Sequence, residues 1–203
     1  MCSEGCSYSI TGNNHKEAQE CRKNGAAALI FSLLLGLALL SSMVGAAERP
    51  SVDQALQMAF PEAQISRESL FLTDAQLQAV TQQSGVDGQR ALTTRFTLRE
   101  GDRVVGWAYL DTHRVRTLPE TLLVMLDEGG RIRRVEVVVF REPPDYLPPL
   151  RWYRQFEGRL LDPQLELKAD IRPMTGATLS VRAATNAVRR ILAVHTVVQR
   201  EVQ

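Results

Sequence analysis

The stretch ALTTRFTLREGDRVVGWAYL, residues 91–110, decides the fold class of this chain. Thr94, Phe96 and Leu98 alternate with arginine and threonine residues. Because successive side chains of a strand point to opposite faces of a sheet, this period of two predicts a strand. The residues EGD at 100–102 are typical of a turn, and RVVGWAYL predicts a second strand after it. The stretch therefore predicts an antiparallel hairpin.

A second hairpin and a long helix follow this one. TLLVML at 121–126 and RIRRVEVVVF at 131–140 predict two further strands around the glycine-rich turn at 127–130. From Ser180 to Val198 the apolar residues instead recur at the spacing of an amphipathic helix. Its predicted inward face holds Val181, Ala184, Val188, Ile191, Leu192, His195 and Val198, and its outward face holds Arg182, Arg189, Arg190 and Gln199. Hairpins followed by a helix predict an α+β fold, with the helix packed on an antiparallel sheet.

Residues 48–88 predict a small helical lead-in before this sheet. Ser51 is a predicted N-cap, followed by apolar residues at helical spacing until Pro61. Thr73-Asp74 opens a second helical pattern, which closes near Ser84-Gly85. We therefore divide the chain into a leader at 1–47, the helical lead-in at 48–88 and the main domain at 90–198.

The leader has the pattern of a secretory signal. Arg22 and Lys23 precede the uncharged run AAALIFSLLLGLALL at 26–40, and the small residues SSMVGAA follow it. We expect cleavage after Ala46 or Ala47; the alternative is an uncleaved membrane anchor. In both cases the basic residues hold the N-terminus inside, so we expect the domain in the periplasm or at the outer face of the inner membrane.

Charge and cysteine content narrow the function classes. The 24 lysine and arginine residues balance 23 aspartate and glutamate residues, and no basic tract alternates with aromatic residues, so we expect no nucleic-acid partner. Cys2, Cys6 and Cys21 all lie in the leader. A cleaved chain therefore has no disulfide and no thiolate metal site.

The run Thr175-Gly176-Ala177-Thr178 lies directly before the predicted terminal helix. The first turn of a helix has free backbone N–H groups and a partial positive charge, and it therefore binds phosphate well. Gly176 allows a close backbone approach, Ala177 adds little bulk, and the two threonines supply hydroxyl groups. The pattern predicts a phosphate site in which a hydroxyl group donates to the phosphate or becomes its ester. In the alternative interpretation, Thr178 or Ser180 is only the N-cap of the helix.

Several segments in order resemble the FMN-binding domain of the periplasmic flavoprotein subunits of sodium-translocating NADH:quinone reductase and Rnf-type complexes. The resemblance covers roughly residues 90–198: the paired hairpins, FREP at 140–143, WYRQFEG at 152–158 and TGATLS at 175–180. It implies FMN as the cofactor, joined to Thr178 through a phosphoester bond by a divalent-metal-dependent flavin transferase. The other site residues that it implies around the ester are Thr175, Gly176, Ala177 and Leu179.

One departure and two further candidates accompany this resemblance. The family usually has an aspartate three residues before its first threonine or serine, where this chain has Arg172, and the nearest acid is Asp170. Glu142 lies where the family has an acid near the flavin, with a solvated loop acid as the alternative. Trp152 is a candidate to pack on the isoalloxazine ring, with a buried core position as the alternative.

The resemblance implies an electron-transfer protein more than an enzyme with its own substrate. FMN carries the redox chemistry, and the protein fixes its position and tunes its potential. We expect a membrane redox complex or a cytochrome as the electron partner; the alternative is a non-flavin periplasmic adaptor or binding module on the same fold. His113 lies in a segment that is expected to border the flavin, whereas His195, on the inward face of the terminal helix, is expected to be a satisfied core histidine.

Overall fold

The computed structural model describes residues 49–200, so the predicted signal or anchor and the three cysteines lie outside the described residues. Five strands form one antiparallel sheet in the order β1-β2-β3-β4-β5. The strands are β1 Gln64–Phe71, β2 Leu92–Glu100, β3 Arg103–Arg114, β4 Pro119–Asp127 and β5 Ile132–Phe140. The helices are α2 Val52–Ala59, α3 Asp74–Ser84, α4 Leu150–Tyr153 and α5 Thr178–Arg200, with short 3-10 turns η2 Pro144–Tyr146 and η3 Arg154–Phe156. From residue 49 to residue 200, no helix has both the length and the apolar content needed to cross a membrane.

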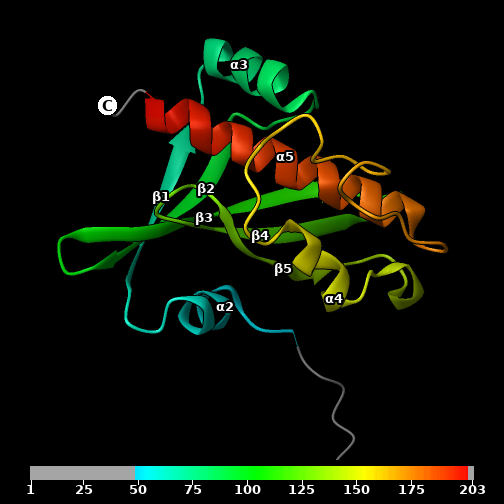
Figure 1. The fold of residues 1–203 in the computed structure, drawn as a ribbon, viewed down its shortest axis with the longest axis horizontal. Helices are drawn as coiled ribbons and strands as arrows, with labels where there is room; N and C mark the ends of the chain where they lie inside the picture. The colour runs from blue at the N-terminus through cyan, green and yellow to red at the C-terminus, as the bar shows by residue number, and fades with distance from the viewer. Residues whose placement is uncertain (1–48, 201–203) are drawn as a thin grey trace, which may run out of the picture. The chain divides into compact units, whose positions relative to one another are not determined.

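Helices cover the sheet on both faces (Figure 1). α5 lies across one face with α3 beside it, and α2 lies against the opposite face. The side chains of β4 alternate between the two layers: Leu122 and Val124 belong to the core beneath α5, whereas Leu123 and Met125 belong to the core beneath α2. β4 is thus buried on both faces, which explains its nearly unbroken apolar run. The predicted α+β fold, with a terminal helix packed on an antiparallel sheet, is confirmed.

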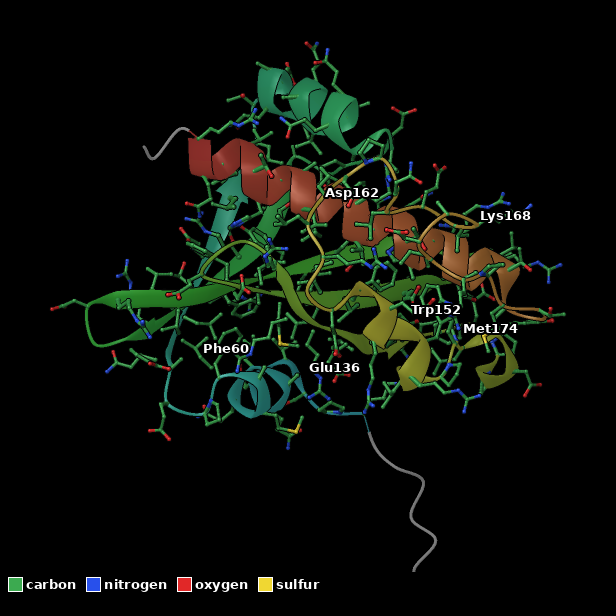
Figure 2. All side chains as sticks on the ribbon, in the orientation of Figure 1. Phe60, Glu136, Trp152, Asp162, Lys168 and Met174 are labelled. Carbon is green, nitrogen blue, oxygen red and sulfur yellow. The ribbon has the colours of Figure 1, made fainter. Side chains whose placement is uncertain are left out.

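Phe60, directly after α2, holds the α2 layer on the sheet (Figure 2). A Cβ atom on Gly106 of β3 would lie 2.8 Å from the Phe60 ring and 2.4 Å from the carbonyl oxygen of Leu126, so only glycine leaves room for the ring. The Arg133 guanidinium lies over the same ring, 4.4 Å from its centroid. The Phe60 ring is therefore held against the sheet by its close packing on Gly106 and by the positive charge of Arg133.

The lead-in is helical only in part. Both predicted caps are present, because Ser51 and Thr73 each accept the backbone N–H three residues further on. Gly85 ends α3 in the left-handed conformation, with φ of 67°. Between the two helices, however, β1 pairs with β2 and extends the sheet, which corrects the prediction of a purely helical segment at 48–88.

The sequence of β1 explains why hydrophobic periodicity does not predict this strand. QISRESLF has no period-two apolar pattern, and only Ile65 and Leu70 are half-buried. As an edge strand, β1 is held by its backbone bonds to β2 and by an ion pair of 2.7 Å between Glu68 and Arg95. A strand stabilised in this way needs no buried face of its own, so hydrophobic periodicity does not detect it.

α5 begins at Thr178, two residues before its predicted start, and its predicted inward face is confirmed by the complete burial of Val181, Ala184, Val188 and Ile191. This apolar face packs on the sheet and supplies most of the side chains that α5 contributes to the core between the sheet and the helix.

The predicted outward face of α5 is wrong for Arg190. Its side chain is 8% exposed and forms an ion pair of 2.9 Å with Asp111 of β3. Arg189 is also turned toward protein, since its guanidinium donates to the carbonyl oxygens of Ser84 and Leu165. Arg189 therefore ties α5 to the end of α3 and to the loop that precedes the predicted phosphate motif. An arginine beside the apolar face of a helix is buried where it meets a carboxylate or backbone carbonyl oxygens. A helical wheel does not show these partners, because they lie on other elements.

Candidate functional site

The first turn of α5 forms one wall of an open pocket of about 170 Å³. The other walls are Val115 and Arg116, which follow β3, together with Glu142 after β5 and Tyr146 of η2. The motif contributes the lining residues 176–180. The structure therefore brings Glu142 to the same pocket as Gly176, Ala177, Thr178 and Leu179, as the resemblance implies.

The backbone at the start of α5 has the features of an anion site. The helical hydrogen bonds begin with the Val181 N–H, which donates to the Ala177 carbonyl oxygen at 3.0 Å. The preceding N–H groups therefore have no partner within the helix. Gly176 has a φ of 86°, a conformation that favours glycine and turns the chain into the helix. These donors, with the helix dipole behind them, provide a seat for a phosphate group.

Thr178 presents an accessible hydroxyl group at this seat. Its side chain is exposed, and Oγ1 donates to the Met174 carbonyl oxygen at 3.4 Å, a long and weak bond. Thr175 is also exposed but does not line the pocket, whereas Ser180 lines it and is 1% exposed. Of the three hydroxyl residues of the motif, Thr178 alone is both exposed and part of the pocket wall.

Glu142 holds the loop that forms another wall of the pocket. Its Oε1 accepts the backbone N–H groups of Thr117 at 2.7 Å, Leu118 at 2.8 Å and Arg116 at 3.2 Å. Because these bonds, that from Leu118 first, favour the charged form, they hold the pKa of the carboxyl below its usual range. Glu142 is only 6% exposed, so the alternative of a solvated loop acid is not supported. The carboxylate instead fixes the position of Arg116 and its neighbours at the pocket.

Trp152 does not line this pocket. It is 6% exposed, and its ring packs edge to face against Tyr153 and Phe156 at 5.1 and 5.4 Å between centroids. α4 and η3 place Trp152 and Phe156 in the core. The structure thus favours the core interpretation of Trp152 over the flavin-stacking one.

Trp152 and Gln155 nevertheless act on the phosphate motif through the backbone before it. Trp152 Nε1 donates to the carbonyl oxygen of Arg172 at 2.8 Å, and the Arg172 N–H donates to Gln155 Oε1 at 2.9 Å. The side chain of Asp170 pairs with Arg159, and both line a different pocket from Thr178. Asp170 therefore does not replace the family's aspartate at the motif.

The sequence did not single out three of the lining residues: Val115, Arg116 and Tyr146. β3 continues to Arg114, past its predicted end at Leu110, and this extension is what carries Val115 and Arg116 to the site. Tyr146 lies in the proline-rich loop at 143–149 and is 38% exposed, a position that the sequence pattern alone did not reveal.

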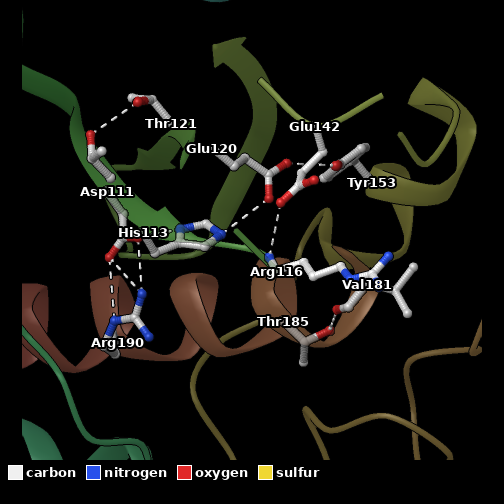
Figure 3. A network of polar contacts seen from close by, with 11 residues as sticks. Asp111, His113, Arg116, Glu120, Thr121, Glu142, Tyr153, Val181, Thr185 and Arg190 are labelled. Atoms are coloured by element: carbon white, nitrogen blue, oxygen red, sulfur yellow. Dashed lines mark hydrogen bonds and ion pairs between the residues drawn. The ribbon is translucent and has the colours of Figure 1, made fainter. Parts of the chain in front are cut away.

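A network of paired charges lies between the sheet and α5 (Figure 3). His113 Nδ1 is 2.7 Å from Asp111 Oδ1, and its Nε2 is 3.1 Å from Glu120 Oε2. Asp111 also accepts from the Arg190 guanidinium, and Glu120 accepts from the Tyr153 hydroxyl at 3.2 Å. Burial alone would lower the pKa of His113, but the hydrogen bonds to the two carboxylates outweigh it and raise the pKa to about 9.

His195, in contrast, is a satisfied core histidine as predicted. It is 8% exposed, its Nδ1 is 2.9 Å from the Tyr109 hydroxyl, and its ring lies 4.8 Å from that of Trp107. Burial lowers the pKa of His195 to about 4, so the ring is neutral at pH 7. Burial raises the pKa of Tyr109 to about 12, so its hydroxyl is protonated, and it donates to Nδ1 when the His195 proton is on Nε2.

The open pocket at the start of α5 combines free N–H donors, an accessible hydroxyl and an aromatic wall, features that suit an aromatic ligand with a phosphate group. The model of the FMN-binding domain family matches residues 118–193, from the start of β4 into α5, and confirms the resemblance. Residues 118–193 are therefore similar to an FMN-binding domain, a match that supports FMN as the cofactor and a flavin-carrying protein. A comparison with curated proteins finds no match for the chain.

The residues at the pocket fit this cofactor. The free N–H groups at the start of α5 match the phosphate of FMN, and no acidic side chain lies within the motif itself. Val115, Tyr146 and Leu179 supply the apolar and aromatic surface that a flavin ring requires, with Arg116 beside them.

Proposed function

We propose that this protein is an exported electron carrier whose FMN is esterified to Thr178 by a flavin transferase. The observation that carries the proposal is the exposed Thr178 hydroxyl at the phosphate seat. A hydroxyl that a second protein must modify has to be reachable from outside, and its weak bond to Met174 is easily given up. The transferase would use a flavin nucleotide with an activated phosphoanhydride as the donor. The Thr178 oxygen would form the new bond to the flavin phosphorus, the phosphoanhydride bond would break, and the rest of the donor would leave as a nucleoside monophosphate that takes up the hydroxyl proton.

The chain's own residues account for the remaining parts of the site. The N–H groups at the start of α5 neutralise the phosphate without a basic side chain. Tyr146 and Leu179, 38% and 48% exposed, provide a surface on which the ring covers apolar groups that otherwise face water. Glu142 keeps the loop at 116–118 in place by accepting its N–H groups. The flavin, when bound, supplies one- and two-electron chemistry that no side chain can perform.

Export and redox partners belong to the same proposal. The basic residues, apolar run and small-residue exit of the leader support secretion to the periplasm or the outer face of the inner membrane. A covalent link is useful there, because a dissociating cofactor is lost from that compartment. We expect a membrane redox complex or a cytochrome to exchange electrons with the flavin.

The test is an absorbance spectrum of the full chain, purified after co-expression with a flavin transferase, before and after acid precipitation. Yellow colour that stays with the precipitate supports the ester. Colour that remains in the supernatant means flavin that is bound but not linked, and it would place the fault at Arg172, where the family has an acid. A colourless protein would contradict the electron-carrier function and favour the adaptor.

A further inference from the structure

The charged network around His113 has a fixed total charge, which the hydrogen-bond pattern determines. Its titratable members are Asp111 on β3, Glu120 on β4, Tyr153 on α4 and Arg190 on α5, all of them facing His113 or its direct partners. Arg190 donates twice to Asp111, so Asp111 is ionised and His113 Nδ1 must carry the proton between them. His113 Nε2 lies 3.1 Å from Glu120 Oε2 and forms the second ion pair of the network. Because the pKa of His113 is raised, the ring is charged, and its charge and that of Arg190 balance those of the two carboxylates.

This neutrality depends on His113. Glu120 is fully buried and Asp111 is 8% exposed, so neither carboxylate is screened well by water. Arg190 compensates one negative charge, and the proton-bearing ring of His113 compensates the other. A neutral side chain in place of His113 would leave one uncompensated negative charge between the sheet and α5.

The network lies next to the flavin pocket along the chain. Val115 and Arg116, two and three residues beyond His113, line that pocket. Glu142 binds the same loop through the backbone N–H of Arg116 (Figure 3). Because the side chains of His113 and Glu120 are largely buried and the chain reaches the pocket two residues after His113, water screens a charge at either residue only weakly.

We propose that His113 is a charge-compensating residue that keeps the region between the sheet and α5 neutral and thereby raises the reduction potential of the flavin. The inference rests on the proposed function. Two-electron reduction adds two electrons from the redox partner and one or two protons from solvent to the flavin; where only one proton is added, the product gains a negative charge. An unpaired buried carboxylate would make it less favourable for the flavin to gain a negative charge. The protonated ring of His113 compensates the charge of that carboxylate and so prevents this effect.

The first measurement needs no flavin. The ring signals of His113 in the flavin-free full chain are assigned by their loss in His113→Gln and followed with pH by NMR. We expect a midpoint well above that of a free histidine, near the pKa of about 9, and protons on both nitrogens at pH 7. A midpoint at or below the free value would overturn the proposal.

The second measurement is the midpoint potential of the flavin-loaded chain at pH 7, by spectroscopic titration. His113→Gln leaves the network with one negative charge and should lower the potential, whereas Glu120→Gln leaves one positive charge and should raise it. A unit charge acting at roughly 10 Å with an effective dielectric constant of about 20 changes an equilibrium constant by about tenfold, or about 30 mV for a two-electron couple. The double variant should return close to the starting value.

The directions of the two potential shifts distinguish an effect of charge from a general disturbance of the structure. A purely structural role would move both single variants in the same direction, and the double variant would not recover; that outcome overturns the proposal. His195→Asn is the matched control, because His195 is a neutral histidine near the other end of α5, and it should leave the potential unchanged. A chain that takes up no flavin contradicts the proposed function, whereas a loaded chain with unchanged potentials contradicts this inference alone.

Discussion

The polar side chain at which α5 begins is exposed, whereas some polar side chains further along the helix are buried and paired. At its start, Thr178 is exposed and the N–H groups of the first turn have no partner in the helix. Further along, Arg190 and His195 are buried, and each is paired across the core with Asp111 or Tyr109 of β3. Since unpaired polar groups are costly inside a protein but not at a pocket mouth, the difference separates the part of α5 that binds a ligand from the part that holds the fold together.

The two largely buried histidines, His113 and His195, differ in charge. His113 lies between two carboxylates and is charged, whereas His195 faces the rings of Tyr109 and Trp107 and is neutral. Both are largely buried, so burial alone does not decide the charge of a histidine. The partner decides it: burial disfavours charge in both, and only carboxylates overcome that effect.

The largest expected effect is at the start of α5. Thr178→Ala removes the hydroxyl proposed for the ester and should abolish covalent flavin completely, as seen by in-gel fluorescence and intact mass after co-expression with a flavin transferase. The free energy of unfolding should fall by no more than about 1 kcal/mol, since the side chain is exposed and its only hydrogen bond is long.

Thr175→Ala is the matched control for this variant, because Thr175 is an exposed threonine of the same motif that does not line the pocket. It should keep an ester-competent hydroxyl and remain fluorescent in a denaturing gel. Fluorescence that survives Thr178→Ala would place the ester on Thr175 or Ser180 instead.

The next effect concerns the middle of α5. Arg190→Met leaves the Asp111 carboxylate buried without its guanidinium partner and should lower the free energy of unfolding by about 3–5 kcal/mol in urea. Arg182→Met changes an exposed arginine of the same helix and should cost less than about 0.5 kcal/mol. Equal losses in the two variants would mean that Arg190 contributes only as a surface residue, as the helical pattern had suggested.

Sequence reasoning succeeded where one pattern controls the structure. Alternation in β2, the caps at Ser51 and Thr73 and the apolar face of α5 are local signals, and the structure contains all of them. It failed where long-range pairing decides, as in the edge strand β1 and the burial of Arg190, because the partner residues lie far away in the chain.

The candidate site shows the same division between local and distant information. The TGATLS segment at 175–180 carries a phosphate-binding signature that can be interpreted from the sequence. The aromatic wall at Tyr146 and the loop at 115–118 reach the pocket only through the fold. Glu142 was singled out, but its action on that loop is visible only in the hydrogen bonds.

The histidine contrast predicts how stability depends on pH. The pKa of His113 is raised to about 9, so its contribution is present below about pH 6.5 and is lost as the pH rises from there to about 9. The pKa of His195 is lowered to about 4, so its contribution is present above about pH 6.5 and is lost as the pH falls to about 4. Each shift corresponds to about 3 kcal/mol.

Urea unfolding of the flavin-free chain at several pH values measures both contributions. His113→Gln should remove the alkaline part of the dependence, and His195→Asn the acidic part between pH 6.5 and 4. If His113→Gln changes the stability by the same amount at pH 6 and pH 10, His113 does not titrate in this range and the contrast between the two histidines fails.

The smallest expected effect is at the Tyr109–His195 pair. Tyr109→Phe keeps the buried ring but removes the hydroxyl that donates to His195 Nδ1 at 2.9 Å, which leaves a buried acceptor unpaired. The free energy of unfolding at pH 7 should fall by about 1 kcal/mol, and the fall should be smaller at acid pH, where the protonated His195 ring no longer accepts the hydroxyl hydrogen. Tyr146→Phe is the control, since Tyr146 is 38% exposed, and it should leave stability unchanged. A loss for Tyr109→Phe that does not vary with pH would show that packing of the Tyr109 ring, rather than its bond to a neutral histidine, stabilises this end of the core.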